Sequence, residues 1–387
     1  MTRASIEEYA AAIRLRYLAA GKREKARILE EFCQTTGYHR KAAIRLLRRP
    51  LRPPRARRRG RPPRYGPGVL PALQLAWEVS EQACGKRLKP FLPELVEALE
   101  RHGELTLSGE VRAQLLALSA STIDRRLAPD RRVGLRRPYR PSPAAGTLKA
   151  QVPIRTFGEW QDVRPGSVQA DLVLHCGEST QGFYLTTLTV VDVATGWTER
   201  QGVWGKGQQR VIGALHRVRL RLPLALREFH TDNGSEFLND LLQPYCQREG
   251  IRTSRGRAYK KNDQAYVEQK NWTAVRRLVG YRRYSSKAAR ERLNAFYELD
   301  RLYRNFFQPI RKGIGKERIG GRVIKRYDQA ATPYQRLVAS GVLDAARCRQ
   351  LEVLYRSLNP VKLRLWLAEA VDALVAERER PQRTRSA

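Results

Sequence analysis

The chain has 387 residues, 42% of them hydrophobic, which predicts two or three folded domains and excludes a chain that is disordered throughout. Its 74 Lys and Arg residues against 38 Asp and Glu residues give a net charge of +36, which favours a polyanionic partner, with nucleic acid ahead of an anionic membrane surface. The sequence contains no apolar run of 18 residues and no signal peptide, so we expect no membrane partner and a cytoplasmic location.

Residues 1–49 form the first predicted domain, which is helical. The sequence "SIEEYAAAIRLRYLAA" places apolar side chains at helical spacing, and two shorter helices flank "TTG" at residues 35–37. A brief turn with glycine between two helices is typical of a helix-turn-helix. The second of these helices is predicted to start near Tyr38 and to present Arg40, Lys41 and Arg45 to DNA. The alternative is a small helical bundle with a basic face.

Residues 50–67 are predicted to be an extended linker. The sequence "RRPLRPPRARRRGRPPR", residues 48–64, holds nine arginines, five prolines and no acid, and proline and charge repulsion both oppose regular structure. The alternative to a solvated spacer is a segment that follows DNA phosphates, and "RGRPPR" also resembles arms that enter A·T-rich minor grooves. The predicted phosphate contacts are Arg57, Arg58, Arg59 and Arg61.

Residues 68–128 are predicted to be a second helical, helix-turn-helix-like DNA-binding domain. Within it, Ser121 and Asp124 have the spacing of a capping box that would open a short basic helix. A second linker rich in Pro and Arg follows at residues 129–150.

Residues 151–308 change in composition and form the predicted core. The segments "SVQADLVLHC" and "GFYLTTLTVVDVATGWTERQGVW" indicate three antiparallel strands joined by short turns. A helix, a strand, a helix, a strand and a helix follow, which is the order of a ribonuclease H-like fold. The predicted fold class is therefore multidomain α plus α/β: helix-turn-helix modules, a mixed-sheet core, and a basic C-terminal region with helices at residues 309–387.

Three acids of the core are the candidate catalytic and metal-binding residues. Asp171 lies in the middle of the first strand, Asp232 at the end of the fourth, and Glu268 in the first turns of the helix after the fifth, with 35 residues between Asp232 and Glu268. Mg²⁺ (or Mn²⁺) takes oxygen ligands, and a pair of such ions can activate an attacking oxygen and stabilise a leaving one. These acids therefore predict a site for two divalent ions.

Other acids remain as alternatives or as structural residues. Asp162 is a weaker alternative to Asp171 as the first ligand, and Asp192 in "VDVATG" is typical of a turn. Glu236 and Asp240 are predicted at the start of a helix, where the helix dipole favours acids, the alternative being a role as metal ligands.

The words "VQADLVLHCGES", "FHTDNGSEF" and "KKNDQAYVEQKNWTAVRRLVGYRRY" resemble the transposases of bacterial insertion sequences that carry a retroviral-integrase catalytic core. The pattern of those enzymes is Asp, Asp, 35 residues, Glu, and the resemblance covers roughly residues 151–340. It implies Asp171, Asp232 and Glu268 as the three metal ligands. In contrast with retroviral integrases, the five scattered cysteines offer no zinc-binding N-terminal module, so recognition of DNA ends must rest on the helix-turn-helix units.

Residues around Glu268 complete the expected site. Lys260, Lys261 and Lys270 are predicted phosphate contacts, the alternative being a generic basic surface, and Asn271 and Trp272 lie one helical turn after Glu268. His175 and His230 share strand parity with Asp171 and Asp232, although histidines in such positions are more often packed in a core.

We therefore expect a DNA transposase that binds terminal inverted repeats, frees a 3′-OH by hydrolysis and joins it to target DNA with two metal ions. Because two DNA ends must be held together, a homo-oligomer associated with the bacterial nucleoid is expected. The alternatives are a metal-dependent nuclease of the same fold and a non-catalytic DNA-binding regulator.

Overall fold

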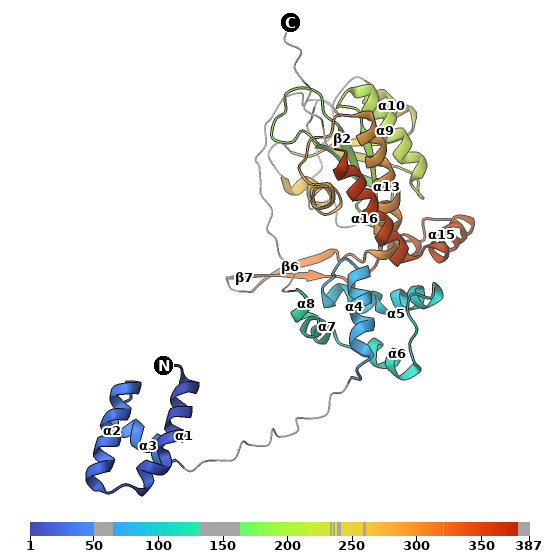
Figure 1. Cartoon of the computed structure of the whole chain (residues 1–387). Helices are drawn as coiled ribbons and strands as arrows, with labels where there is room; N and C mark the ends of the chain where they lie inside the picture. Colours follow the sequence, from blue (N-terminus) through green and yellow to red (C-terminus); the bar gives the residue numbers. More distant parts are fainter. Residues whose placement is uncertain are drawn as a thin grey trace. The chain divides into compact units, whose positions relative to one another are not determined.

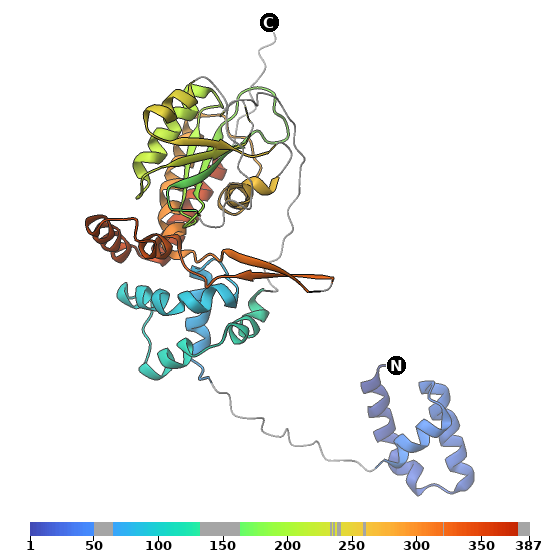
Figure 2. The same cartoon turned by 180° about the vertical axis from the view of Figure 1, so that it is seen from behind.

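The computed structural model describes residues 1–49, 65–131, 163–232, 234, 237, 241–257, 261–319 and 321–377. The chain divides into two compact units, residues 1–64 and residues 65–387. Figures 1 and 2 show the elements of both units from opposite sides.

The first unit contains three helices around a small apolar core. These are α1 (Arg3–Ala19), α2 (Lys22–Thr36) and α3 (Arg40–Arg48). Gly37 ends α2 with a φ of 72°, a left-handed conformation that glycine adopts without strain, and the His39 side chain accepts a hydrogen bond from the Lys41 amide at the start of α3. The two predicted helices around "TTG" are confirmed, and the second starts at Arg40 because Tyr38 and His39 belong to the turn.

The second unit begins with the helices α4 (Val69–Val79), α5 (Gly85–Arg101), α6 (Gly109–Leu116), α7 (Ala120–Arg126) and α8 (Ala128–Arg131). The predicted helical character of residues 68–128 is confirmed. The predicted capping box at Ser121 is wrong, since Ser119 is the N-cap of α7 and accepts from the Thr122 amide at 3.2 Å. Asp124 instead accepts from the Gly85 amide at 2.8 Å and pairs with Arg131 at 2.7 Å, so it fastens α7 to the start of α5.

A five-stranded mixed sheet follows, in the order β3-β2-β1-β4-β5. The first three strands are an antiparallel meander, as predicted, and β4 and β5 are added parallel to β1 and to each other. The strands are β1 (Ser167–Leu174), β2 (Thr186–Asp192), β3 (Thr198–Val203), β4 (Glu228–Thr231) and β5 (Arg252–Arg255). This mixed sheet with flanking helices confirms the ribonuclease H-like core.

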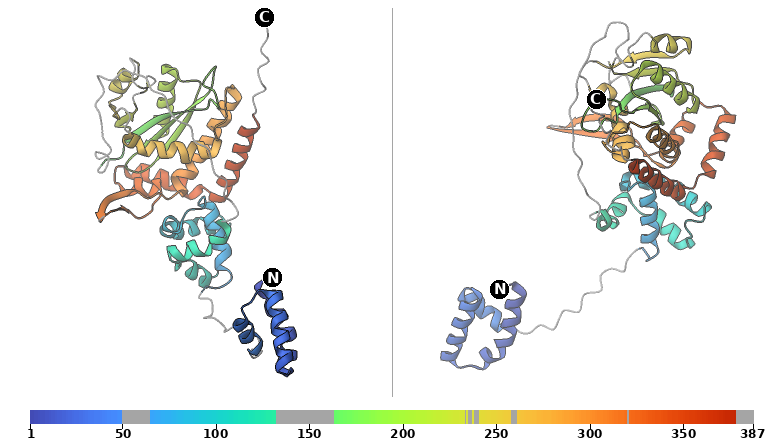
Figure 3. Two further views of the ribbon diagram at one scale, coloured as in Figure 1. Left: turned by 90° about the vertical axis from the view of Figure 1, so that its left-hand side faces the viewer. Right: turned by 45° about the horizontal axis from the view of Figure 1, so that its top comes forward.

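Helices pack against this sheet along its length (Figure 3). Helices α9 (Gln208–Arg221) and α13 (Lys287–Phe307) contact β3, α10 (Leu242–Arg248) contacts β5, and α11 (Ala265–Lys270) contacts β1 and β2. The helical region around α11 changes type several times: it starts with a 3₁₀ turn, η2 (Lys261–Gln264), and continues after α11 as a π-helix, η3 (Asn271–Arg276), and α12 (Arg277–Val279). π-Helical segments are frequent at functional sites.

The C-terminal part is a β-ribbon followed by three helices. The elements are β6 (Gly313–Ile319), β7 (Arg322–Tyr327), α14 (Pro333–Ala339), α15 (Ala345–Ser357) and α16 (Pro360–Ala376). Among the described residues, no helix combines the length and the apolarity needed to cross a membrane.

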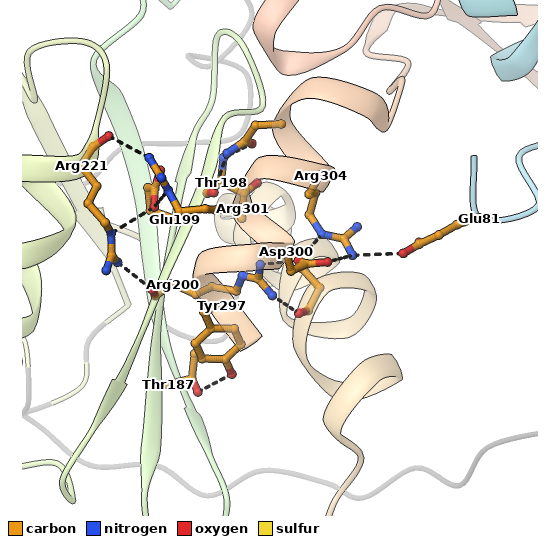
Figure 4. Close-up of polar contacts among 12 residues, drawn as sticks. Glu81, Thr187, Thr198, Glu199, Arg200, Arg221, Tyr297, Asp300, Arg301 and Arg304 are labelled. Atoms are coloured by element: carbon orange, nitrogen blue, oxygen red, sulfur yellow. Dashed lines mark hydrogen bonds and ion pairs between the residues drawn. The ribbon is translucent and has the colours of Figure 1, made fainter. Parts of the chain in front are cut away.

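A buried charge cluster joins the helices of residues 65–131 to the core (Figure 4). Arg200 on β3 and Arg304 on α13 both bind Asp300, which also lies on α13. Nε of Arg304 lies 2.9 Å from Oδ2 of Asp300. Arg304 also lies 3.6 Å from Glu81 in the α4–α5 connection, and Arg364 lies 3.7 Å from the same carboxylate. The helical region that the sequence suggested as a separate DNA-binding domain thus belongs to the same compact unit as the sheet.

Candidate active site

The pairing of β1 with β4 places the first two predicted acids side by side. These strands run parallel, with Gln169 in register with His230. Two residues later come Asp171 within β1 and Asp232 directly after β4. Neighbouring strands lie about 4.8 Å apart, and side chains in parallel register project to the same face. Asp232 follows the last residue of β4, and its Oδ1 accepts from the Gly234 amide at 2.9 Å, so this acid also forms the turn that ends the strand.

Gln169 brings the helix of the third acid to the same face of β1. Its side chain lies two positions before Asp171 and is fully buried. Oε1 accepts from the backbone amides of Tyr266 at 3.1 Å and Val267 at 3.2 Å, while Nε2 donates to the Asp263 carbonyl at 2.9 Å. Gln169 therefore occupies the N-terminal end of α11, which carries Glu268 one turn later.

Sequence reasoning missed Gln169. The available signal was a second polar residue within the strand, at the i−2 position that shares a face with Asp171. Asp is depleted from strands and stands out there, whereas a single Gln in a strand carries no such signal.

The three carboxylates influence one another electrostatically. Burial raises the pKa of Asp171 from its ordinary value of 3.8 to about 7, and the negative charges of Asp232 and Glu268 add to this increase. Like charges close together disfavour ionisation of each other, and perturbed acids of this kind cluster at functional sites. The arrangement stores repulsion that a bound cation would relieve.

Asn271 links the π-helix after Glu268 to the first acid. Its Nδ2 donates to Oδ2 of Asp171 at 2.6 Å, while Oδ1 of Asp171 accepts from the Leu172 amide at 2.8 Å. The amide oxygen of Asn271 is buried and has no hydrogen-bond partner within the described parts of the chain. An amide oxygen that could serve as a metal ligand therefore lies beside the acids without a hydrogen-bond donor from the described residues.

These residues fit a divalent cation by their chemistry. Mg²⁺ takes oxygen ligands in proteins, chiefly carboxylates. The negative charges that raise the pKa of Asp171 would be neutralised by a bound cation. Among the described residues, no group of three or more His, Cys, Asp or Glu side chains stands at metal-binding spacing. The three acids therefore lie close enough for their charges to interact, but their side chains do not converge on one point.

The histidines near the acids are packed in the core. His175 is fully buried, its Nε2 lies 2.7 Å from the Thr187 hydroxyl, and burial together with Arg276 lowers its pKa to about 3, so the ring stays neutral. His230 is also fully buried, with Nδ1 3.0 Å from the Ser254 hydroxyl. Asp192 accepts from the amides of Gly166 and Thr195, both at 2.8 Å, as expected for a turn residue.

The predicted phosphate contacts fall into three groups. Arg40, Lys41 and Arg45 are exposed on α3. Lys270 is only 6% exposed, and burial beside Arg304 and Arg87 lowers its pKa to about 7. Its position therefore does not support the predicted phosphate contact, because the α11 face on which it lies packs against the protein. The remaining candidates lie outside the described residues, or in the case of Lys261 outside the described side chains: Arg57, Arg58, Arg59, Arg61 and Lys260, together with the alternative acids Asp162, Glu236 and Asp240.

Comparisons with known proteins show which family this chain belongs to. Residues 163–261 match the family model "Integrase core domain", which spans β1 to β5 and includes Asp171 and Asp232 but ends before Glu268. The chain is 46% identical over 330 residues to "Uncharacterized protein y4rM" of Sinorhizobium fredii (strain NBRC 101917 / NGR234), a match that covers 85% of this chain and 94% of that protein. This chain belongs to the y4rM family and carries an integrase core domain.

The integrase core supports an activity of the polynucleotidyl transferase type, with DNA as the partner. Among solved structures, the catalytic core domain of BIV integrase is similar at 17% sequence identity and a TM-score of 0.28, over 45% of this chain and 95% of that one. The predicted resemblance to proteins with a retroviral-integrase core is confirmed at the level of the core domain.

Proposed function

We propose that this integrase-core protein is the transposase of a bacterial insertion sequence. The observation that carries the proposal is the β1–β4 register, which brings Asp171 beside Asp232 while Gln169 fixes the helix of Glu268 to the same strand. These are the acids that the transposase pattern requires, and a basic chain of net charge +36 offers the surroundings that DNA phosphates need.

Asp171, Asp232 and Glu268 would hold two Mg²⁺ (or Mn²⁺) ions. When bound, such ions activate the attacking oxygen and stabilise the leaving oxygen of a phosphodiester exchange. Asn271 holds one oxygen of Asp171 in place, and Gln169 keeps the Glu268 helix within reach of β1. These contacts hold together the elements that carry the acids, and water first and a DNA 3′-OH afterwards would be the nucleophile at one site.

The N-terminal unit would bind the terminal inverted repeats through α3, whose Arg40, Lys41 and Arg45 are exposed after a three-residue turn. α2, this turn and α3 would then act as a helix-turn-helix, with α3 as the recognition helix in the major groove. Joining two element ends to one target requires a homo-oligomer, and work on chromosomal DNA would place the protein at the nucleoid.

The test is a strand-transfer assay with labelled element ends, Mg²⁺ and a plasmid target. Wild type should join ends to the plasmid, whereas Asp232→Asn and Glu268→Gln should bind the ends with unchanged affinity and produce no joined product. Glu178→Gln, which removes an exposed acid of the same core, is the matched control and should join normally. Cleavage without joining by wild type would indicate a nuclease, and binding without any cleavage in Mg²⁺ or Mn²⁺ a regulator.

A further inference from the structure

The ribbon formed by β6 and β7 is firmly anchored at its base. Asp328 accepts from the Lys312 amide at 2.7 Å and from Arg336 on α14 at 2.6 Å, and Arg336 also donates to the Ile310 carbonyl at 3.0 Å. The Lys312 ammonium donates to the Ala194 carbonyl in the β2–β3 turn at 2.8 Å. These contacts fix the direction in which the ribbon leaves the core.

Beyond its base the ribbon is uncovered on both faces. Figure 2 shows the two strands extending past the helices next to them. Alternate residues of a strand point to opposite faces, yet every residue from Val323 to Tyr327 is exposed. Val323 is 58% exposed and Ile314 67%. Ile324 and Tyr327 of the same ribbon are exposed as well, at 44% and 43%. A two-stranded hairpin is marginally stable by itself, and several apolar side chains exposed on one element favour an interaction site.

The charge of the ribbon specifies the chemistry of the partner. Residues 311–327 hold seven Lys and Arg residues and one acid, Glu317, which pairs with Arg326 at 2.5 Å. Arg318 is in register with Val323, so Lys325, two residues after Val323, shares their face of the ribbon. This face presents cations around an apolar side chain.

Duplex DNA matches both properties of the ribbon. The major groove, about 12 Å wide, admits a two-stranded β-ribbon, the phosphates at its edges pair with cations, and thymine methyl groups give its floor apolar character. A second protein chain would have to supply a strongly acidic surface, whereas this chain is basic as a whole.

We propose that the β6–β7 ribbon is a second DNA-binding arm that enters the major groove of duplex DNA. The inference deepens the proposed function, since it assigns part of the DNA contact to the catalytic unit rather than to the N-terminal helices. Arg318 and Lys325 contact phosphates, and Val323 lies toward the bases.

The experiment measures binding of the full-length protein to a duplex, without divalent metal, over a range of salt concentrations. Arg318→Ala/Lys325→Ala should reduce the slope of log affinity against log salt by about 2, with roughly tenfold or more weaker binding near 0.1 M salt. The matched control is Arg349→Ala/Lys362→Ala, which removes two exposed cations from α15 and α16. Both variants should melt at the temperature of wild type.

A footprint with dimethyl sulfate, which methylates guanine N7 in the major groove, then locates the ribbon. Wild type should protect guanines that the ribbon variant leaves reactive. Equal losses of affinity in ribbon and control variants would overturn the proposal, as would a ribbon variant that binds DNA normally but changes oligomeric state, which would make the ribbon a subunit interface. Normal ribbon-dependent binding by a protein that joins no DNA would refute the transposase proposal while leaving the arm intact.

Discussion

Asn271 donates a hydrogen bond to Asp171 across 2.6 Å, joining the π-helix that follows Glu268 to the strand of the first acid. The two residues are 100 positions apart in the sequence. Replacing Asn271 therefore removes a contact that positions Asp171, a candidate metal ligand, while all three carboxylates stay in the chain.

Asn271→Ala should leave DNA binding unchanged and lower strand transfer by about 10- to 100-fold, the usual effect of losing a residue that orients a metal ligand. Because the defect lies in ligand positioning, the Mg²⁺ concentration for half-maximal joining should rise. Gln269→Ala, an exposed neighbour on α11, is the control. Joining with an unaltered Mg²⁺ requirement in Asn271→Ala would show that the amide does not position Asp171.

Gln169→Ala should destabilise the fold and impair joining together. The change leaves the amides of Tyr266 and Val267 and the carbonyl of Asp263 without this partner, and an unsatisfied buried group costs about 1–3 kcal/mol. Urea unfolding measures the loss, with the exposed Gln247→Ala as control. An unchanged free energy of unfolding would mean that α11 does not depend on this contact.

Divalent metal should stabilise the protein more at pH 8 than at pH 5. The pKa of Asp171 is raised to about 7, first by burial and then by the charge of Asp232, so the folded state favours the protonated acid. The contribution of Asp171 to stability is therefore present at low pH and is lost as pH rises from about 4 to about 7. A cation offsets this loss only where the acid is ionised.

The measurement is the melting temperature with and without Mg²⁺ at both pH values. In Asp171→Asn the uncharged side chain removes both the pH-dependent loss and most of the Mg²⁺ effect. A Mg²⁺-induced shift of the same size at pH 5 and pH 8 in wild type would contradict a site built on Asp171.

Asp300→Asn should lower the free energy of unfolding far more than the loss of a surface acid does. Although burial opposes ionisation, the charges of Arg200 and Arg304 hold the pKa of Asp300 below its ordinary value. Breaking a buried charge cluster costs about 3–5 kcal/mol, whereas Glu352→Gln, which removes the exposed partner of Arg356, should cost about 0.5 kcal/mol or less.

The same shift sets the pH dependence of that loss. A depressed carboxyl pKa stabilises the fold above the ordinary Asp range, and this stabilisation disappears as pH falls through the lower folded-state value. The difference in unfolding free energy between wild type and Asp300→Asn should therefore shrink in acid. A difference that is constant from pH 7 to pH 3 would show that Asp300 stabilises the core by packing alone.

Arg40→Ala/Lys41→Ala should weaken binding to element ends and leave the melting temperature unchanged, since both side chains are exposed on α3. Competition between end-containing and random duplexes separates recognition from general charge attraction. Lys22→Ala/Arg23→Ala removes two exposed cations from α2 and should weaken binding to both duplexes slightly and to the same extent. Equal effects of the two double variants on end preference would argue against α3 as the recognition helix.

The sequence by itself determined the elements of the sheet core and their order, but it predicted irregular structure where the structure has the β6–β7 ribbon. Val- and Thr-rich strands with turn residues between them predicted the meander, Asn-Gly after Asp232 marked the end of β4, and the 35-residue spacing pointed to Glu268. These signals are local, because propensity, periodicity and turn chemistry act within a few residues of one another.

Only the tertiary structure decided which residues meet. The register that sets Asp171 beside Asp232, the capping of α11 by Gln169 and the burial of Lys270 all depend on strands and helices that are distant in sequence. Asp124 likewise serves the start of α5 instead of its own helix. A buried polar group takes whatever partner the packed fold brings within hydrogen-bond distance, and no local pattern records which segment that will be.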